Sequence, residues 1–475
     1  MKTYENQAHT MSDIKKTIFR EYDLRGRVSD EELNNESCKI IGKGFGSFLK
    51  QHNVKEAIVG YDAREYSERL KDALVSGIIS TGINVVEIGR VLTPIAYFAQ
   101  HHLNIKGLAV VTASHNENGW SGFKLGYDFE TTLLPEDIKR LYQIILKDDF
   151  VEGSGNIRKE SDIIQSYSDY LLKKIKFKKS LKVVINAGNG TAGPIVPPIL
   201  KRAGCEVVEQ YCNIDFTFPH HEPNPASISA LNALSAKVKE SGADIGFGFD
   251  GDGDRLGVVD EKGSIVWPDR FLILLARQIL KEKPGSSIVF DVKCSESLIE
   301  EIKKNGGNPV MWKTGHSFIK KKAKEIKAAL AGERSGHIFY SHGYYGYDDA
   351  IFASLKLIQY LLEQNEPLSE IMLGTPQYFT SPTWQVYCAD EIKYEVADRL
   401  VEEFKKEYGS DKVIDISGAR VKFDDGWGLV RASSNLPVLV LVFESKTKQG
   451  LERIKSIFRE RLSKHPEIGK EWKSG

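Results

Sequence analysis

Residues 107–116 have the sequence GLAVVTASHN, in which a short apolar segment runs directly into a serine. The apolar residues 107–111 are typical of a buried strand, and Ser114 follows immediately. The segment does not fit the G-x-S-x-G turn of an esterase, because Thr112 and Asn116 stand where that turn requires glycine. A capped loop is the simpler alternative, since Ser, Thr and Asn satisfy free backbone groups at the ends of strands and helices. The corresponding loops further along the chain distinguish the two interpretations.

The same order of strands recurs in three consecutive parts of the chain. Each part has three short apolar strands separated by helical patterns, which predicts parallel βαβ units. The expected strands are 57–62, 83–88 and 107–111, then 182–186, 205–208 and 244–249, then 287–291, 308–312 and 328–332. Ligands bind outside the carboxyl ends of such strands, so the residues after each third strand are candidate ligand loops. A further strand leading into a turn is expected over 17–26.

The C-terminal part has a different pattern, with several strands between two helices and a hairpin signal at Asp425-Gly426. The sequence therefore predicts an α/β protein with three similar parallel-sheet α/β domains and a smaller C-terminal α+β domain. The predicted boundaries are a flexible tail at 1–16 and domains at 17–160, 161–265, 266–375 and 376–475.

Composition limits the classes of function. With 65 basic and 65 acidic residues in 475, the chain has no net field that would attract nucleic acid or an anionic membrane. No apolar run reaches the roughly 20 residues of a membrane helix, and the polar N-terminus does not resemble a signal peptide. The five cysteines form no C-x-x-C pair. We therefore expect reduced thiols in a cytoplasmic protein.

The loop after the second unit's third strand reads DGDGDR over residues 250–255. Glycines between the aspartates let three hard oxygen donors converge on one cation, such as Mg²⁺, Ca²⁺ or Mn²⁺. An EF-hand is the alternative, because Glu261 stands at position 12 of a loop that starts at Asp250. Arg255 in place of the required glycine and the strand-like residues 256–260 oppose it. The predicted metal ligands are Asp250, Asp252 and Asp254.

Two further loops carry polar groups suited to a sugar phosphate. Residues 332–337 read GERSGH, where Glu333 and Ser335 offer the acceptor and donor that sugar hydroxyls need and His337 can move a proton near neutral pH. Residues 431–437 read RASSNLP, which combines a guanidinium fork, two hydroxyls and an amide, and this suits a phosphate dianion. A polar helix start and a bare hairpin turn are the respective alternatives. Lys124 and Arg20 are candidate cations, with solvated surface charges as their alternative.

The four motifs T-A-S-H-N, D-G-D-G-D-R, G-E-R-S-G-H and R-A-S-S-N-L-P, in this order, closely resemble the α-D-phosphohexomutase superfamily, in particular phosphomannomutase/phosphoglucomutase. The resemblance extends from about Ile18 to near the C-terminus. It implies four domains around one deep central cleft, each contributing a loop. It also implies an intramolecular phosphotransferase that interconverts hexose 6-phosphate and hexose 1-phosphate, with mannose as the sugar and glucose as a further candidate.

The same resemblance implies roles for single residues. Ser114 would carry a phosphoryl group, and an oxygen of that group would join the three aspartates around Mg²⁺. Lys124 and His337 match proposed general base and acid groups, and Arg20 would be a further catalytic cation. The positions implied to bind substrate are Arg255, Glu333, Ser335, Arg431, Ser433, Ser434 and Asn435. Hexose 1,6-bisphosphate would be the intermediate and activator.

Two departures from the family pattern concern the binding loops. The phosphate loop commonly reads R-A-S-N-T-x-P, whereas Ser434 and Asn435 replace Asn and Thr here. Arg334 occupies a variable position of the sugar loop, directed either to the cleft or to solvent. A phosphoglucosamine mutase is the nearest enzymatic alternative, followed by a phosphatase and by a non-catalytic sugar-phosphate-binding regulator. The expected partners are small hexose phosphates, without nucleic acid or membrane, for a monomer or weak homodimer.

Overall fold

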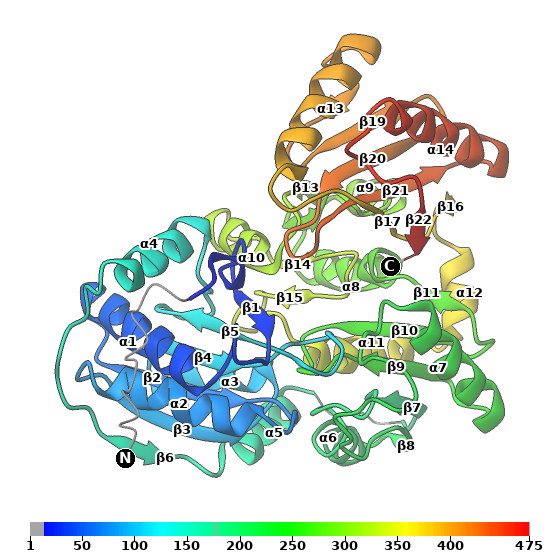
Figure 1. Ribbon diagram of the computed structural model, residues 1–475. Coiled ribbons are helices and arrows are strands. Elements are labelled where there is room, and N and C mark those ends of the chain that lie inside the picture. Colours follow the sequence, from blue (N-terminus) through cyan, green and yellow to red (C-terminus); the bar gives the residue numbers. More distant parts are fainter. Residues whose placement is uncertain (1–13, 176, 178, 475) are drawn as a thin grey trace.

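The computed structural model describes residues 14–175, 177 and 179–474 of the chain (Figure 1). Most of the predicted tail, residues 1–13, lies outside this part. Among the described residues the first regular element is a 3₁₀ helix at Lys16–Ile18, whose first residue is the last of the predicted tail. Among the described residues, no helix combines the length and hydrophobicity needed to cross a bilayer.

The first domain is built on a six-stranded sheet with strand order β1-β5-β4-β2-β3-β6. Its strands are β1 (Leu24–Arg27), β2 (Glu56–Tyr61), β3 (Asn84–Arg90), β4 (Gly107–Val111), β5 (Trp120–Gly126) and β6 (Ile157–Lys159). Its helices are α1 (Asn35–Gln51), α2 (Ser67–Ile79), α3 (Thr93–Leu103) and α4 (Pro135–Leu146), and α5 (Ile163–Lys174) leads to the second domain. β2 pairs in parallel with β3 and β4, whereas β5 is antiparallel to β4 and β1.

The second and third domains repeat the central part of this arrangement. The second sheet has the order β11-β10-β9-β7-β8 and the third the order β13-β12-β14-β15. The second domain contains β7 (Lys182–Asn186), α6 (Val196–Ala203), β8 (Glu206–Gln210), α7 (Ile228–Ser241), β9 (Ile245–Phe249), β10 (Leu256–Asp260) and β11 (Ile265–Val266). The third contains α8 (Pro268–Glu282), β12 (Ser287–Asp291), α9 (Glu296–Lys304), β13 (Asn308–Trp312), α10 (His316–Glu325), β14 (Leu330–Gly332), β15 (Ile338–Tyr340), α11 (Ala350–Gln364) and α12 (Leu368–Leu373).

The three sheets are mixed, which corrects the expectation of parallel sheets. In each domain the first three repeated strands are parallel, and the next strand returns antiparallel beside the third, as β5, β10 and β15 do. The connections that carry the candidate loops are too short for a parallel crossover, which needs a dozen or more residues and usually a helix. Each loop is therefore anchored at both ends in one sheet.

The N-terminal strand expected over residues 17–26 is also corrected. The structure has the 3₁₀ helix at Lys16–Ile18, a tight turn and only then β1. The turn is closed where the Arg20 N–H donates to the Asp23 carbonyl at 2.9 Å and where Phe19 bridges Leu24. These local bonds bend the segment. Its apolar residues had indicated an extended strand.

The fourth domain contains a seven-stranded sheet covered by two helices, as Figure 1 shows at the top. Its elements are β16 (Phe379–Thr380), β17 (Trp384–Tyr387), α13 (Lys393–Tyr408), β18 (Val413–Ile414), β19 (Ala419–Phe423), β20 (Gly426–Ala432), β21 (Val438–Ser445), α14 (Lys448–Ser463) and β22 (Trp472–Ser474). β19, β20 and β21 pair antiparallel in sequence order, joined in part by the hairpin predicted at Asp425-Gly426. The predicted boundary at 265/266 divides β11, whereas those at 160/161 and 375/376 fall between sheets.

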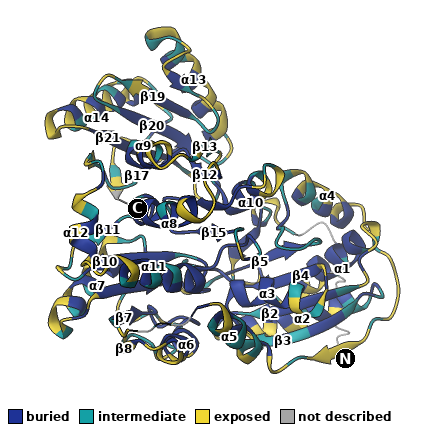
Figure 2. Cartoon of the chain, turned by 180° about the vertical axis from the view of Figure 1, so that it is seen from behind, coloured by how far each residue is buried: buried dark blue, intermediate teal, exposed yellow. Residues whose placement is uncertain are grey.

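One part of the hydrophobic core is shared by the first three domains, whereas the fourth domain has a core of its own. One buried cluster runs through the first three domains and includes Phe98, Tyr167, Phe247 and Phe271. The fourth domain has its own cluster. In Figure 2 the buried residues pass through the centre of the molecule, whereas the ends of α13 and α14 carry exposed residues. A small cluster of Val292, Trp427, Leu429 and Val442 joins the third and fourth domains.

Candidate active site

Ser114 lies in the loop between β4 and β5 and is only 2% exposed. Its hydroxyl donates a hydrogen bond to Asp250 Oδ2 at 2.9 Å, and its backbone N–H donates to Thr112 Oγ1 at 2.8 Å. Its φ of 52° lies in the left-handed region, which is unfavourable for a residue with a Cβ. Such strain persists where the surroundings determine the conformation, as they often do at functional sites. The loop therefore presents its serine directly to the loop of the second domain.

A buried ion pair that the sequence reasoning missed supports the serine loop. Arg64 donates to Asp62 Oδ2 at 2.6 Å, and the same carboxylate accepts the Ala113 N–H at 3.3 Å. Arg64 also donates to the backbone carbonyls of Ser114, at 3.2 Å, and Asn116. Asp62 directly follows β2, the strand beside β4. Its place after the carboxyl end of a parallel strand was the signal in the sequence that could have identified it.

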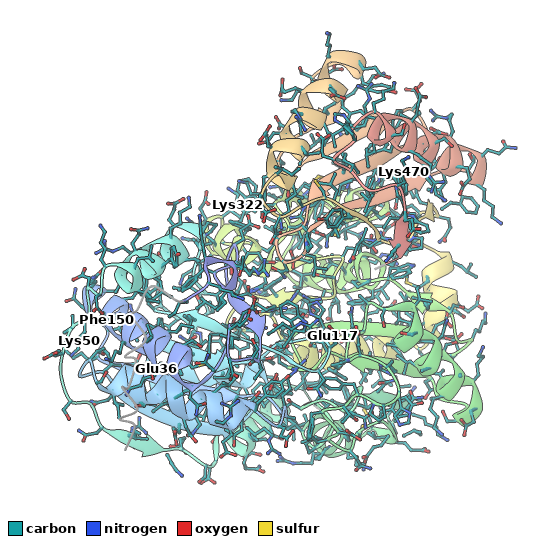
Figure 3. All side chains as sticks on the ribbon, in the orientation of Figure 1. Glu36, Lys50, Glu117, Phe150, Lys322 and Lys470 are labelled. Atoms are coloured by element: carbon teal, nitrogen blue, oxygen red, sulfur yellow. The ribbon has the colours of Figure 1, made fainter. Side chains whose placement is uncertain are left out.

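The serine loop reaches the second domain beyond Ser114 as well. Glu117, labelled in Figure 3, lies between the first domain and the elements of the second. Burial and the negative charge of Glu117 raise the pKa of Glu222, which belongs to the second domain. The charge of the serine loop therefore acts on a residue of the second domain.

The three predicted metal ligands, Asp250, Asp252 and Asp254, are each completely buried. One carboxylate oxygen from each lies within 4.8 Å of those of the others. Asp252 Oδ1 and Asp254 Oδ1 are buried without a hydrogen-bond partner in the described part of the chain. Buried carboxylate oxygens need a compensating partner, and hard oxygens suit a divalent cation such as Mg²⁺. The donor set therefore fits a divalent metal.

The metal loop and the serine loop touch through their backbones. A Cβ added at Gly251 would lie 2.3 Å from the Ser114 carbonyl oxygen, so only glycine fits this contact. Gly253, two residues later, has φ of 72°, which glycine adopts without strain. These two glycines let the aspartate loop fold tightly against Ser114.

The EF-hand alternative is excluded by the position of Glu261. Its carboxylate accepts hydrogen bonds from the N–H of Ser369, at 3.2 Å, and from the hydroxyl of the same residue. Strand β10 also begins directly after Arg255 and runs to Asp260, where an EF-hand would still have the second half of its 12-residue ion-binding loop. Glu261 therefore connects the second and third domains and takes no part in the aspartate loop.

Lys124 projects from β5 into the aspartate loop. Its ammonium pairs with Asp252 at 2.7 Å and with Asp254, and Thr93 donates to Asp252 at 2.6 Å. Burial disfavours the charged ammonium, but the charges of Asp252 and Asp254 outweigh it and raise the pKa of Lys124. Burial and the same two charges raise the pKa of Asp250 well above its ordinary value. Lys124 thus brings a positive charge against the aspartate loop.

Glu333 and Ser335 lie in the loop between β14 and β15 and line a common cleft. Glu333 accepts a hydrogen bond from the Gly315 N–H, and Ser335 donates to Glu333 at 3.3 Å. Burial raises the pKa of the Glu333 carboxyl above its ordinary value. The pair thus places a carboxylate and a hydroxyl at the wall of the cleft.

His337 follows in the same loop and is held on both sides. Its Nε2 accepts from Arg255 Nε at 2.9 Å, and its Nδ1 lies 3.0 Å from Asp348 Oδ2. Because Nε2 accepts, we assign the ring hydrogen to Nδ1, which faces Asp348. Asp348 in turn pairs with Lys320 at 3.2 Å. Sequence reasoning missed Asp348, which precedes the residue that caps α11 and so resembled part of a helix start.

Arg334 points neither to solvent nor freely into the cleft. Its guanidinium pairs with Asp269 at 2.9 Å and donates to Thr380 Oγ1 and to the Ser381 carbonyl, each at 3.0 Å. The residue is 4% exposed and lies at the wall of the cleft. Arg334 therefore ties the sugar loop to the connection between the third and fourth domains.

The predicted phosphate loop connects β20 and β21 at the opposite side of the cleft. Arg431 donates to Ser417 Oγ at 3.2 Å and to Ser434 Oγ at 3.4 Å, so the substituted Ser434 is a direct neighbour of the guanidinium. Ser433 Oγ accepts the N–H groups of Asn435 and of the leucine after it. A hydroxyl-closed turn beside an arginine suits a phosphate group.

Arg20 has its ion-pair partner in the fourth domain and not in the serine loop. Arg20 pairs with Asp390 of the fourth domain at 2.8 Å. Of the two arginines in this segment, it is Arg25 that contacts the serine loop: it pairs with Asp23 and donates to Asn116 Oδ1 at 2.9 Å. Both arginines stand in the same segment, FREYDLRG. The sequence therefore marked Arg25 as a candidate cation, but it did not show which of the two arginines contacts the serine loop.

A cleft of about 210 Å³ lies between the four domains, and each domain contributes to its lining. From the first three domains come residues that include Tyr22, His115, Asn116, Arg255, Lys293, Thr314, His316, Glu333, Ser335 and His337. The fourth domain adds Arg431, Ser433, Ser434 and Asn435. Ser114 is directly behind His115, whose Nδ1 is 3.1 Å from the serine hydroxyl. The four predicted loops therefore meet at one central cleft.

The comparison with solved structures identifies the class of fold. The described architecture is similar to the crystal structure of a phosphoglucomutase/phosphomannomutase family protein from Burkholderia thailandensis, with 37% sequence identity and a TM-score of 0.87. The match covers 95% of this chain and 98% of that one. The chain thus has the four-domain α/β fold of the phosphohexomutases.

Family models then specify the family. They are described as phosphoglucomutase/phosphomannomutase alpha/beta/alpha domains I, II and III and C-terminal domain, and they match residues 16–152, 165–263, 267–379 and 391–461. The chain belongs to the phosphoglucomutase/phosphomannomutase family. It is 40% identical to a phosphomannomutase/phosphoglucomutase of Pseudomonas aeruginosa over 446 residues, covering 94% of this chain and 95% of the relative. It is 38% identical to a phosphoglucomutase of Neisseria meningitidis over 463 residues, covering 96% and 99%.

Proposed function

We propose that this protein is an intramolecular phosphotransferase that interconverts hexose 6-phosphate and hexose 1-phosphate, with mannose as the main sugar and glucose as a further substrate. The observation that carries the proposal is the 2.9 Å hydrogen bond between Ser114 Oγ and Asp250 Oδ2, within the aspartate loop and behind a cleft shared by four domains. The names of the relatives at 40% and 38% identity support the choice of sugars.

The three aspartates would hold Mg²⁺ together with an oxygen of phosphorylated Ser114. The unpartnered oxygens of Asp252 and Asp254 support this assignment. A bound Mg²⁺ supplies Lewis-acid polarisation of the phosphoryl oxygens. Lys124 and Arg255 add positive charge on either side, which a phosphoserine surrounded by three carboxylates requires.

The proposed reaction consists of two exchanges at Ser114 Oγ. In the first, the bond between phosphorus and Oγ breaks while a bond forms to the free hydroxyl oxygen of a bound hexose phosphate. The hydroxyl proton leaves the substrate and a proton reaches Oγ, with Lys124 in the position of the general base and His337 in that of the general acid. The hexose 1,6-bisphosphate reorients, and the reverse exchange returns the other phosphoryl group to Ser114. Positioning and charge neutralisation are the main requirements of such transfers.

The remaining loops orient the substrate. Glu333 and Ser335 would hold sugar hydroxyls, because they present an acceptor and a donor to the cleft. Arg431, Ser433, Ser434 and Asn435 would hold the phosphate group that is not reacting. This division leaves the sugar free to bind in two orientations, since either phosphate can occupy the fixed site.

Coupled assays test the proposal. Purified protein with Mg²⁺ should interconvert mannose 1-phosphate and mannose 6-phosphate, and the corresponding glucose phosphates, after priming with a hexose bisphosphate. Activity with glucosamine 6-phosphate alone would replace the proposal by a phosphoglucosamine mutase. Release of inorganic phosphate in place of an isomeric sugar phosphate would indicate a phosphatase. Absence of both turnover and phosphate on Ser114 by mass spectrometry would indicate a non-catalytic regulator.

Two further expectations accompany the proposal. The five cysteines are free thiols, which supports the reducing cytoplasm as the site of action. Gel filtration of the purified protein should give a monomer or a weak homodimer.

A further inference from the structure

One ion pair connects the first domain to the fourth near the cleft. Arg20 Nη1 lies 2.8 Å from Asp390 Oδ2, and the two side chains are 15% and 31% exposed. Arg20 belongs to the N-terminal turn before β1, and Asp390 lies just before α13. Figure 1 shows the dark blue N-terminal turn below the orange α13.

The second oxygen of Asp390 leads to the phosphate loop. Lys393 Nζ pairs with Asp390 Oδ1 at 2.6 Å and also donates to the Leu436 carbonyl at 3.0 Å. The Lys393 side chain is only 3% exposed. Leu436 follows Ser433, Ser434 and Asn435 in the loop that would hold the non-reacting phosphate. A continuous set of contacts thus runs from Arg20 through Asp390 and Lys393 to this loop.

The charges of Arg20, Asp390 and Lys393 stabilise this set of contacts. Two cations share one carboxylate, and each uses a different oxygen of it. Burial opposes ionisation of Asp390, but the hydrogen bonds and charges of Lys393 and Arg20 outweigh it and lower the pKa of the carboxyl. Tyr394 makes a second contact across the same boundary, donating to Glu21 Oε2 at 3.4 Å. Asp390 therefore stays charged at neutral pH and keeps both partners.

We propose that Arg20 is a positioning residue for the phosphate loop, acting through Asp390 and Lys393, and that it does not contact the phosphoryl group being transferred. The inference rests on the proposed function and replaces the catalytic role that the sequence suggested for Arg20. It follows that Arg20 sets the distance between the domain that carries Ser114 and the loop that anchors the other end of the substrate.

Steady-state kinetics distinguish positioning from catalysis. Arg20→Gln should raise KM for the hexose phosphate about tenfold with kcat within about twofold, because the phosphate contact is made equally in ground and transition states. Arg20→Lys should restore most of the affinity, since one cationic donor suffices for Asp390 Oδ2. Lys15→Gln is the matched control, because Lys15 pairs with Glu31 on the surface of the same domain, at 43% and 79% exposure. A fall in kcat with KM unchanged, or no effect on either, would overturn the proposal.

A double-mutant cycle tests the route. Arg20 and Lys393 have no direct contact in the described structure, so their effects couple only if Asp390 transmits them. Lys393→Met should raise KM, and adding Arg20→Gln should then raise it no further. Fully additive effects of the two substitutions would contradict a route through Asp390.

A measurement without turnover keeps the inference independent of the proposed function. Hydrogen exchange of the backbone amides in residues 433–438 should be faster in Arg20→Gln and in Asp390→Asn than in wild type, and unchanged in Lys15→Gln. Equal protection in all four proteins would overturn the positioning role. A wild-type protein that lacks mutase activity would refute the proposed function alone, because the exchange result is obtained without substrate.

Discussion

Three properties distinguish Ser114 from an ordinary capping serine. It is buried, its backbone is in the left-handed region, and its hydroxyl donates to a carboxylate of another domain. An ordinary capping serine would need none of these, because its hydroxyl would bond to a nearby backbone N–H. Its surroundings thus favour a chemical role over the structural alternative.

Replacing Ser114 with alanine should abolish turnover while the fold remains. We expect kcat to fall by at least about a thousandfold, as for the loss of a nucleophile. The residue is buried in a loop and contributes no apolar area to the core, so circular dichroism and melting temperature should change little. Insoluble or unfolded protein would contradict this assignment.

Replacing Asp252 with asparagine should weaken metal binding as well as catalysis. The amide is neutral and has one fewer anionic oxygen for the cation, and it leaves Lys124 with a single carboxylate partner. The concentration of Mg²⁺ that gives half-maximal activity should rise by about tenfold or more, and isothermal titration should report the same change. An unchanged Mg²⁺ dependence would remove Asp252 from the ligand set.

At the residue scale, the sequence indicated those residues of the candidate site that lie together in one short motif. It missed those whose partners are far away in the chain. Asp250, Asp252 and Asp254 lie within one turn, and their spacing alone indicated a cation site. Arg25, Arg64 and Asp348 reach the site only through tertiary packing. No local pattern separates such residues from surface charges.

The repeated element of this protein is a third strand, a loop and an antiparallel return strand. Strands β4, β7, β9, β12 and β13 have nearly the expected bounds, because continuous apolar runs identify buried strands well. The sequence indicates the return strand β10 at residues 256–260, but it does not indicate that this strand runs antiparallel to β9. Direction depends on the length of the connection and on pairing, which the apolar pattern does not encode.

Close packing between two such loops predicts a sensitive glycine. Gly251→Ala would place a Cβ 2.3 Å from the Ser114 carbonyl oxygen, and backbone atoms on both sides must then move apart. We expect activity to fall more than tenfold and stability to drop by about 1–3 kcal/mol, as for overpacked cores. Assays and chemical unfolding of the variant measure the two effects.

Gly374→Ala is the control for this substitution. The nearest atom to a Cβ at Gly374 is 3.4 Å away, an ordinary contact distance, and the residue lies after α12, far along the chain from the loops. Activity should stay at the wild-type level. Equal losses in both variants would show that the effect of Gly251→Ala does not depend on contact with Ser114.

The whole molecule consists of a three-domain body and a fourth domain joined to it by a small apolar cluster and by buried polar contacts. Arg420 is completely buried at this junction: it stacks on Trp427, 3.6 Å from the ring centroid, and donates to the carbonyls of Val292 and Cys294. It also pairs with Glu296 at 2.8 Å. These contacts flank Lys293, which lines the cleft, so one arginine of the fourth domain fixes a cleft residue of the third.

Replacing Arg420 with methionine should loosen the fourth domain. The substitution leaves two buried carbonyls without a donor and Glu296 without its partner, at a cost of about 2–4 kcal/mol. We expect a lower melting temperature in calorimetry and faster proteolysis between residues 375 and 382. Arg453→Met is the control, because that arginine is 49% exposed and pairs with Asp425 at the surface. A melting curve identical to that of the control would contradict the role of Arg420.

Because each sheet is formed by one contiguous stretch of chain, the order of synthesis matters for this protein. Domains emerging from a ribosome fold as units, with the N-terminal ones first. Ser114 and the aspartates can therefore meet while the fourth sheet is still being translated, but residues 431–437 join them only once that sheet has been made. A product interrupted before residue 431 would contain Ser114 and the aspartate loop without the loop between β20 and β21. The newly made chain thus gains all four loops of the cleft only after the fourth domain has been translated.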